Sequence, residues 1–258
     1  MTNKKYIFFI DIDETLIPTG QTEIPTDIVE EIERLKKLGY IFVVSTGRSL
    51  NSTLVIKHIE VFEYISALMG GCIYQTSSKE ILDKGQSMPR EQIKKLVDIL
   101  NKQNIEWSYK DEIYEKTIFH DSQFFRSTAD CKYVSLSEFY SDLENNKVMQ
   151  FLFVQHLPKT ILKDFPDLNF FEMQQGYTDV SLKDATKARC IKFFKNKYPN
   201  LTTVSIGDSF NDVPMFETTD ISIAMGNSCD LIKQKTTFVT KDINNGGLIY
   251  AFRNILKI

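Results

Sequence analysis

Three short segments that predict buried strands constrain the fold of this chain more than any other feature. They cover residues 6–10, 40–44 and 204–206, of which the first two are continuous apolar runs and the third is Val-Ser-Ile. Continuous apolar runs of this length are typical of strands that are buried on both faces of a parallel sheet. A helical pattern over residues 25–39 joins the first run to the second, and Gly39 ends it. Alternating strands and helices predict an α/β fold with a doubly wound parallel sheet, covered by helices on both faces.

Further elements of the same kind lie near both ends of the chain. Residues 65–69 are predicted to form a strand, and a helix is expected from about residue 184 to residue 197. The C-terminal pattern then predicts a helix start at 212–216, strands at 221–225 and 238–240, and a last helix near 247–255. One domain would therefore be built from both ends of the chain.

The middle of the chain, from about residue 86 to residue 175, has a different pattern. It predicts a helix (91–101), a hairpin (105–110 and 113–118), a helix (136–143), a strand (148–154), a helix near Leu162 and a strand (168–173). Aromatic residues are dense here, and we expect most of them to form a core of their own. The pattern predicts a separate α+β unit, residues 85–177, inserted into an outer domain of residues 1–84 and 178–258, with linkers at 85–89 and 174–176.

Length, charge and cysteine usage exclude several classes of protein. The formal net charge of −3 lacks the basic excess of a nucleic-acid-binding protein, and no apolar run approaches the ~18 residues of a membrane span. Asp11 and Asp13 interrupt the first apolar run, which argues against a secretory signal. The four cysteines form no Cys-x-x-Cys pair, so we expect neither a disulfide framework nor a zinc site. We expect a cytoplasmic protein that is a monomer or a weak homo-oligomer.

Two carboxylates, Asp11 and Asp13, follow the first predicted strand directly. Open α/β sheets bind ligands at the carboxyl ends of their strands. Alternation along an extended segment directs both side chains to the same side, and two neighbouring carboxylates repel each other unless a cation joins them. Oxygen ligands alone favour Mg²⁺. The pair therefore indicates a cation site, although an Asp-x-Asp pair also serves as a helix or turn cap.

A hydroxyl, a glycine and an arginine follow the second predicted strand. Thr46, Gly47 and Arg48 could hold an anion through the hydroxyl, backbone N–H groups and the guanidinium. The alternative is an ordinary turn with a solvated arginine. Lys187 lies near the start of a later predicted helix, where neighbouring lysines make a solvated helix face the simpler interpretation.

A second acidic motif follows the strand at 204–206. Gly207 allows close backbone approach, and Asp208, Asn211 and Asp212 lie on the tight turn after it. The alternative is an Asx-turn combined with a helix cap. Because the carboxyl ends of neighbouring parallel strands meet at one edge of a sheet, the motifs together predict one site with a metal, a nucleophile and anion donors.

Taken together, these motifs resemble those of the haloacid-dehalogenase-like hydrolase superfamily, most closely its Cof-type sugar-phosphatase branch. The family begins with Asp-x-Asp-x-Thr after an apolar strand, which residues 11–15 match. Its second motif ends in Thr-Gly-Arg, as residues 46–48 do, and its fourth is Gly-Asp-x-x-Asn-Asp, as at residues 207–212. Its third motif, a lysine before a small residue and an apolar helix, fits Lys187 best. One departure is visible, because the family usually has Asn-Gly where this chain has two glycines, at residues 70–71.

The resemblance extends to residues 224–227 (Ala-Met-Gly-Asn) and to residues 239–242. It implies a doubly wound, Rossmann-like core, with the inserted α+β unit as a cap domain that acts as a substrate-specificity lid. It also implies a Mg²⁺-dependent phosphatase that hydrolyses small phosphorylated metabolites, either sugar phosphates or phosphorylated cofactors, through an aspartyl-phosphate.

The resemblance assigns a role to each motif residue. Asp11 would attack phosphorus, and Asp13 would protonate the leaving alcohol and then activate water. Mg²⁺ would be bound by the Asp11 carboxylate, the Asp13 backbone carbonyl and Asp208. The other roles are substrate binding by Thr46, Gly47, Arg48 and Asn211, charge stabilisation by Lys187, and positioning of Lys187 and the metal shell by Asp212.

Three other functions use parts of the same motif set. A phosphomutase would use the same Asp11 and return the phosphoryl group to its substrate. A receiver-type signalling module also carries an acid cluster with a phosphorylated Asp, but it is about half this length and has no inserted cap. A catalytically silent binding protein on the same scaffold would lack at least one catalytic residue, and this chain has the expected residue at every catalytic position of the motifs.

Overall fold

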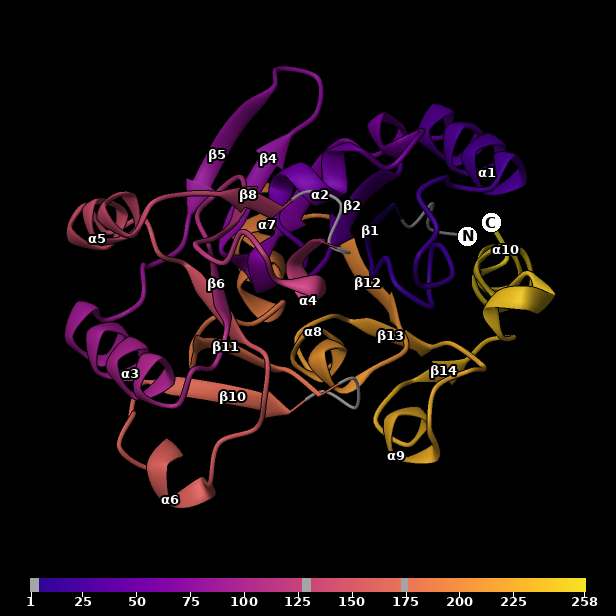
Figure 1. Cartoon of the computed structure of the whole chain (residues 1–258). Coiled ribbons are helices and arrows are strands. Elements are labelled where there is room, and N and C mark those ends of the chain that lie inside the picture. The colour runs from indigo at the N-terminus through magenta and orange to yellow at the C-terminus, as the bar shows by residue number, and fades with distance from the viewer. Residues whose placement is uncertain (1–4, 127–130, 173–175) are drawn as a thin grey trace. The chain divides into compact units, whose positions relative to one another are not determined.

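The computed structural model of the chain describes residues 5–126, 131–172 and 176–258 (Figure 1). It divides into two compact units. Unit 1 consists of Met1–Arg48, Thr53–Asp83 and Thr186–Ile258, and unit 2 consists of Ser49–Ser52 and Lys84–Ala185. Within these described ranges, no helix combines the length and the apolar character needed to cross a membrane.

Unit 1 is built on an eight-stranded sheet. In order across the sheet, its strands are β14 (Phe238–Val239), β13 (Ile221–Ala224), β12 (Thr202–Gly207), β1 (Tyr6–Ile10), β2 (Ile41–Ser45), β3 (Tyr64–Ala67), β4 (Cys72–Gln75) and β5 (Glu80–Lys84). The six strands from β14 to β3 are parallel to one another, whereas β4 runs antiparallel to β3. The predicted α/β fold class is confirmed. Strands β4 and β5, which the sequence pattern does not predict, make the sheet mixed rather than wholly parallel.

The register of the three central strands brings their carboxyl ends together. Ile10, the last residue of β1, is level with Val44 of β2 on one side and with Ile206 of β12 on the other. Just beyond the strand, the Asp11 N–H group donates to the Ile206 carbonyl at 3.0 Å. The motifs that follow these strands therefore start from neighbouring points on one edge of the sheet.

Helices cover both faces of this sheet. Successive residues of β1 point to opposite sides, so each face carries apolar side chains that a layer of helices can bury. On one face, Ile7 and Phe9 share a core with apolar residues of α7 (Ala188–Lys197), α8 (Val213–Phe216) and α9 (Asp230–Lys233). On the other face, the Phe8 ring stacks on that of Phe42 at 4.8 Å, and both meet Phe252 edge-on.

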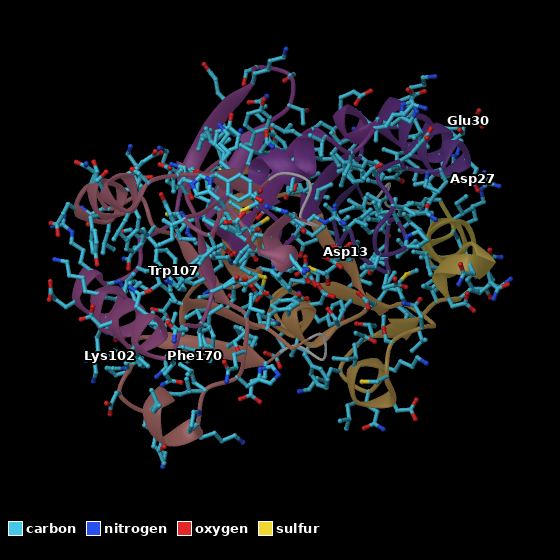
Figure 2. All side chains as sticks on the ribbon, in the orientation of Figure 1. Asp13, Asp27, Glu30, Lys102, Trp107 and Phe170 are labelled. Carbon is cyan, nitrogen blue, oxygen red and sulfur yellow. The ribbon has the colours of Figure 1, made fainter. Side chains whose placement is uncertain are left out.

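Helix α1 (Thr26–Lys37) buries Ile32 and Leu35. The side chains of Asp27 and Glu30 are exposed and lie on its outer face (Figure 2). Its apolar residues are therefore confined to one stripe, as the sequence pattern predicts. Further short helices are α2 (Leu50–Leu54) and the 3₁₀ turns Ile59–Val61, Leu68–Gly70 and Ile243–Asn245.

Three helices of unit 1 differ from their predicted bounds. The helix expected from about residue 184 begins at Ala188, so Lys187 occupies the N-cap position after a turn that Arg189 N–H closes onto the Thr186 carbonyl. The segment expected at 212–216 is a 3₁₀ turn, Phe210–Asp212, followed by α8. The last helix is split into α10 (Gly247–Tyr250) and a π-helix, Ala251–Leu256.

Unit 2 contains a six-stranded sheet with helices. The order across the sheet is β10 (Leu168–Glu172), β11 (Thr178–Leu182), β9 (Gln150–Phe153), β6 (Trp107–Lys110), β7 (Glu115–Thr117) and β8 (Cys131–Tyr133). Its helices are α3 (Arg90–Lys102), α4 (Gln123–Arg126), α5 (Leu136–Glu144) and α6 (Lys159–Leu162). Its core combines aromatic and aliphatic residues; Trp107 is buried in it and Phe170 packs against it (Figure 2).

The limits of unit 2 follow from its strand pairing. The sequence pattern predicts that the insertion ends at residue 177, whereas β11 pairs with β9 and β10, and unit 2 continues to Ala185. Strand β11 contains both polar and apolar residues, so no change of composition marks this end of the insertion. Met173, the last residue of a predicted strand, lies outside the described residues, as do residues 174 and 175 of the predicted second linker.

Candidate active site

Asp11, the first residue after β1, is held by a lysine from a distant part of the chain. Its carboxylate accepts a hydrogen bond from the Lys187 ammonium, which also donates to Asp212 Oδ1 at 2.6 Å. The Lys187 and Asp212 side chains are fully buried, and that of Asp11 is 7% exposed. A buried lysine requires such partners, because an unpaired buried charge is strongly unfavourable. The interpretation of Lys187 as part of a solvated helix face is therefore wrong.

Asp212 organises the turn that follows β12. Its Oδ2 accepts the backbone N–H groups of Asp208 at 2.9 Å and of Ser209 at 3.0 Å, while Oδ1 receives Lys187. Gly207 is required beneath this carboxylate, since a Cβ at that position would lie 2.5 Å from Asp212 Oδ2. The turn thereby fixes the Asp208 side chain at the same edge of the sheet as Asp11.

One carboxylate oxygen from each of Asp11, Asp208 and Asp212 lies within 4.8 Å of the others. Three carboxylates against the one ammonium of Lys187 leave a formal excess of two negative charges. Such a set of hard oxygen donors with this charge fits a divalent cation such as Mg²⁺. Because both oxygens of Asp212 already accept hydrogen bonds, Asp11 and Asp208 are the better placed to ligate an ion directly.

The carboxylate of Asp13 is directed elsewhere. It pairs with Arg48 through two bonds, from Nη2 to Oδ1 at 2.5 Å and from Nε to Oδ2 at 3.0 Å (Figure 2 labels Asp13). The cluster of three carboxylates does not include the side chain of Asp13. This is compatible with the sequence-based expectation that Asp13 would bind the metal through its backbone carbonyl. Arg48, predicted to bind substrate, is engaged with Asp13 in this structure.

Thr46 is fixed at the end of β2 by its backbone. Its N–H group donates to the Ser66 carbonyl at 2.9 Å, and its carbonyl accepts from Met69 N–H at 3.0 Å. The Thr46 hydroxyl accepts the Arg48 N–H group at 3.1 Å, which leaves its own proton free to donate to an anion. Gly47 lies close to Met69, because a Cβ on Gly47 would meet the Met69 sulfur at 3.3 Å.

The other predicted residues and two unpredicted features complete this region. Asn211 is exposed, and its Oδ1 accepts from the Ser209 hydroxyl at 2.7 Å. Thr15, for which no role was predicted although it belongs to the first motif, donates to Asp208 Oδ1 at 3.3 Å. Gly70 has a left-handed φ of +86°, and a Cβ there would lie 2.7 Å from the Thr186 carbonyl oxygen. An asparagine at Gly70, as in the family motif, would require this backbone to shift.

Burial and mutual repulsion alter the acidity of the cluster. Burial raises the pKa of Asp11 well above its ordinary value, an effect that the Lys187 ammonium opposes. Burial first, and then the negative charge of Asp212, raise the pKa of Asp208 to about 7. Burial acts to lower the pKa of Lys187, but the charges and hydrogen bonds of Asp11 and Asp212 together outweigh it and raise the pKa. Without a cation, the site therefore favours a bound proton near neutral pH.

This acidity predicts a pH dependence of stability. The native pKa of Asp208, about 7, lies above the unfolded value of roughly 3.9, so the native state binds more protons between these values. The contribution of Asp208 to metal-free stability is therefore largest below about pH 4 and is lost as the pH rises through 7. Since a metal ion needs ionised ligands, its stabilising effect should grow over the same range.

We expect the melting temperature with Mg²⁺ to exceed that with EDTA by about 4 °C or more at pH 8, and by little at pH 5. Differential scanning fluorimetry at four pH values would measure the difference. Asp208→Asn is the control, because it should flatten the pH dependence. A Mg²⁺ effect that is equal at all pH values would contradict the assignment of Asp208.

Comparison with known proteins identifies the family. The family model described as haloacid dehalogenase-like hydrolase matches residues 8–252. The chain belongs to this family. It is a phosphatase of the family, a phosphoric monoester hydrolase of the Cof-type branch, as the motifs predicted.

Two relatives and one solved structure illustrate the similarity. Phosphoglycolate phosphatase of Nitrosopumilus maritimus is 24% identical over 258 residues, covering 99% of this chain and 98% of the relative. The 5-amino-6-(5-phospho-D-ribitylamino)uracil phosphatase YitU of Bacillus subtilis is 24% identical over 249 residues, with 91% of each chain covered. The structure of the subclass IIB sugar phosphatase BT4131 superposes with a TM-score of 0.80 at 22% identity, covering 99% of this chain and 100% of that one.

Proposed function

We propose that this protein is a Mg²⁺-dependent phosphatase that hydrolyses small phosphorylated metabolites through an aspartyl-phosphate on Asp11. The observation that carries the proposal is the Asp11–Lys187–Asp212 chain of buried ion pairs, with Asp208 beside it. It presents one carboxylate as a nucleophile at the edge of the sheet and places a fixed positive charge against it. An ionised carboxylate needs no base to activate it, which suits Asp11 to this role.

Asp11 and Asp208 would hold the Mg²⁺ ion through their carboxylates, and Asp13 through its backbone carbonyl. When bound, the ion would neutralise charge on the phosphate and reduce its repulsion of the Asp11 anion. Asp212 holds the turn that carries Asp208 and, by its bond to Lys187, fixes the ammonium beside Asp11. We therefore assign Asp212 a positioning role.

In the first chemical step, an Asp11 oxygen attacks phosphorus and the bond from phosphorus to the ester oxygen breaks. Asp13 gives a proton to that oxygen, so the alcohol leaves neutral. In the second step, Asp13 takes a proton from a water molecule that attacks phosphorus. The bond between Asp11 and phosphorus then breaks, which releases phosphate and restores the carboxylate.

The remaining residues would bind the phosphoryl group and the leaving-group side of the substrate. Lys187 would place its positive charge against the phosphoryl oxygens, and the Thr46 hydroxyl would donate its proton to one of them. Gly47 and Asn211 would add hydrogen-bond donors to the same group. In this structure Arg48 donates to both oxygens of Asp13, which is the pairing of an ionised carboxylate. We propose that Arg48 turns to the substrate on the leaving-group side, which would free Asp13 to carry the proton of the first step.

The substrate class is proposed from relatives and from the motifs. The name of YitU specifies a phosphorylated ribitylaminouracil, and BT4131 is described as a sugar phosphatase. We propose sugar phosphates or phosphorylated cofactors for this chain, with the inserted residues 85–177 as the lid that selects among them. Cys131, Cys190 and Cys229 are in no disulfide, which supports the cytoplasmic location that we propose. We also propose a monomer or a weak homo-oligomer.

Hydrolysis of p-nitrophenyl phosphate and of a panel of hexose, pentose and cofactor phosphates tests this function. We expect phosphate release with Mg²⁺ and a loss of about a hundredfold or more with EDTA. The products of each sugar phosphate would be separated, because a phosphomutase would yield an isomeric ester in place of free phosphate. Equal turnover in EDTA, or release of no phosphate across the panel, would contradict the proposal.

A further inference from the structure

We propose that Asn227 is a positioning residue of this site, whose side-chain amide holds the turn that follows Asp13. The inference rests on the proposed function of Asp13. Asn227 Nδ2 donates to the Glu14 carbonyl at 2.9 Å, and Asn227 Oδ1 accepts from Ile243 N–H at 3.0 Å. One amide group thus joins the loops that follow β1, β13 and β14.

The turn held in this way is an unfavourable one for its residue. Glu14 has a left-handed φ of 57°, a region that side chains other than glycine seldom adopt. Its N–H group donates to the Ile17 carbonyl at 2.9 Å, and its Oε1 accepts from Thr19 N–H at 2.8 Å. Asn227 binds the Glu14 carbonyl, the backbone group that these two bonds leave unrestrained.

The conformation of Glu14 determines where Asp13 points. A change in φ of Glu14 rotates the peptide group between residues 13 and 14, and this group carries the Asp13 carbonyl proposed as a metal ligand. The same rotation would displace the Asp13 carboxylate from the leaving group. Loss of the Asn227 bond lets Glu14 relax towards an ordinary backbone conformation, so its effect reaches Asp13 without contact with substrate.

The loop that presents Asn227 is itself rigid. Gly226 N–H donates to the Lys241 carbonyl at 3.0 Å, and a Cβ on Gly226 would lie 2.4 Å from Asp242 N. A Cβ on Gly247 would lie 2.2 Å from the Lys241 carbonyl oxygen. Backbones packed this closely cannot shift to replace a lost contact. Because the Asn227 side chain is exposed, it fills no core, and its two hydrogen bonds are the contacts that a substitution would remove.

The test compares Asn227→Ala, Asn227→Asp and Asn245→Ala. Asn245 is the matched control, since its amide also donates at this end of the sheet, to Asp242 Oδ2 at 2.6 Å. We expect Asn227→Ala to lower kcat about tenfold with KM within about twofold, and to leave the melting temperature nearly unchanged. Asn227→Asp keeps the acceptor for Ile243 but turns an oxygen to the Glu14 carbonyl, so its kcat should fall at least as far. Asn245→Ala should match the native protein.

Hydrogen exchange of the segment 10–17 provides a readout that does not depend on activity. Exchange there should be about tenfold faster in both Asn227 variants and unchanged in Asn245→Ala. Unaltered exchange and unaltered kcat in Asn227→Ala would overturn the proposal. Native behaviour in Asn227→Asp would also overturn it, because the bond to Ile243 would then be the one that matters. If the native protein hydrolysed no ester, the proposed function would fail, while exchange would still decide whether Asn227 holds the turn.

Discussion

Asp11→Asn is expected to lower kcat/KM by at least about ten-thousandfold, the largest loss of any single substitution in this chain. An amide of the same shape cannot form the covalent bond to phosphorus. The fold should survive, because Lys187 keeps its bond to Asp212 Oδ1 at 2.6 Å. Replacing the Asp11 carboxylate also removes the unfavourable burial of its charge and the repulsion from Asp212 and Asp208, so the metal-free variant should be at least as stable as the native protein.

Steady-state hydrolysis of p-nitrophenyl phosphate, together with thermal unfolding in EDTA, measures both parts of this prediction. Asp27→Asn is the control, because Asp27 is an exposed acid on the outer face of α1 (Figure 2). It should retain native turnover. Turnover in Asp11→Asn within about tenfold of the native rate would remove Asp11 from the nucleophile's role, whatever the metal dependence.

Lys187→Met is expected to produce the largest loss of stability. It replaces the ammonium with an apolar group of similar length and leaves Asp11 and Asp212 facing each other without a cation. Removing one member of a buried ion-pair set costs about 3–5 kcal/mol, so the free energy of unfolding should fall by that amount. Turnover should fall by about a thousandfold, because the Lys187 ammonium would no longer stabilise the negative charge on the phosphoryl oxygens.

Urea unfolding gives the change in free energy. Lys192→Met is the matched control on the same helix, because Lys192 is exposed, and it should cost less than about 0.5 kcal/mol. In the double variant with Asp11→Asn, the loss should be smaller than the sum of the single changes, since the repulsion is then reduced. A Lys187→Met protein as stable as the native one, or strictly additive losses, would show that the buried pairs are not what holds Lys187.

The sequence predicts the central sheet well because its strands are buried on both faces. The strand segments predicted at 6–10, 40–44 and 204–206 fall within two residues of β1, β2 and β12 at each end. The strands β4 and β5 are not recognisable in the same way, because Thr76 to Lys79 is a polar turn and β5 is only partly buried. Their pairing with the sheet depends on tertiary contacts.

Much of the candidate site could likewise be predicted from strand ends, but its ion pairs could not. Asp11 and Asp208 follow buried parallel strands, so the topology alone brings them together. Lys187 has four other lysines near it in sequence, and its full burial becomes evident only in the folded chain. The pair formed by Arg48 and Asp13 joins loops 35 residues apart, which spacing does not reveal.

Trapping of the covalent intermediate tests the central claim most directly. Native protein would be mixed with ³²P-labelled p-nitrophenyl phosphate and Mg²⁺, quenched in acid within milliseconds and digested. We predict label on the peptide that contains Asp11, labile to hydroxylamine as an acyl phosphate is, and absent from Asp11→Asn. Rapid phosphate release from the native protein with no label on Asp11, or label on another residue, would contradict the account.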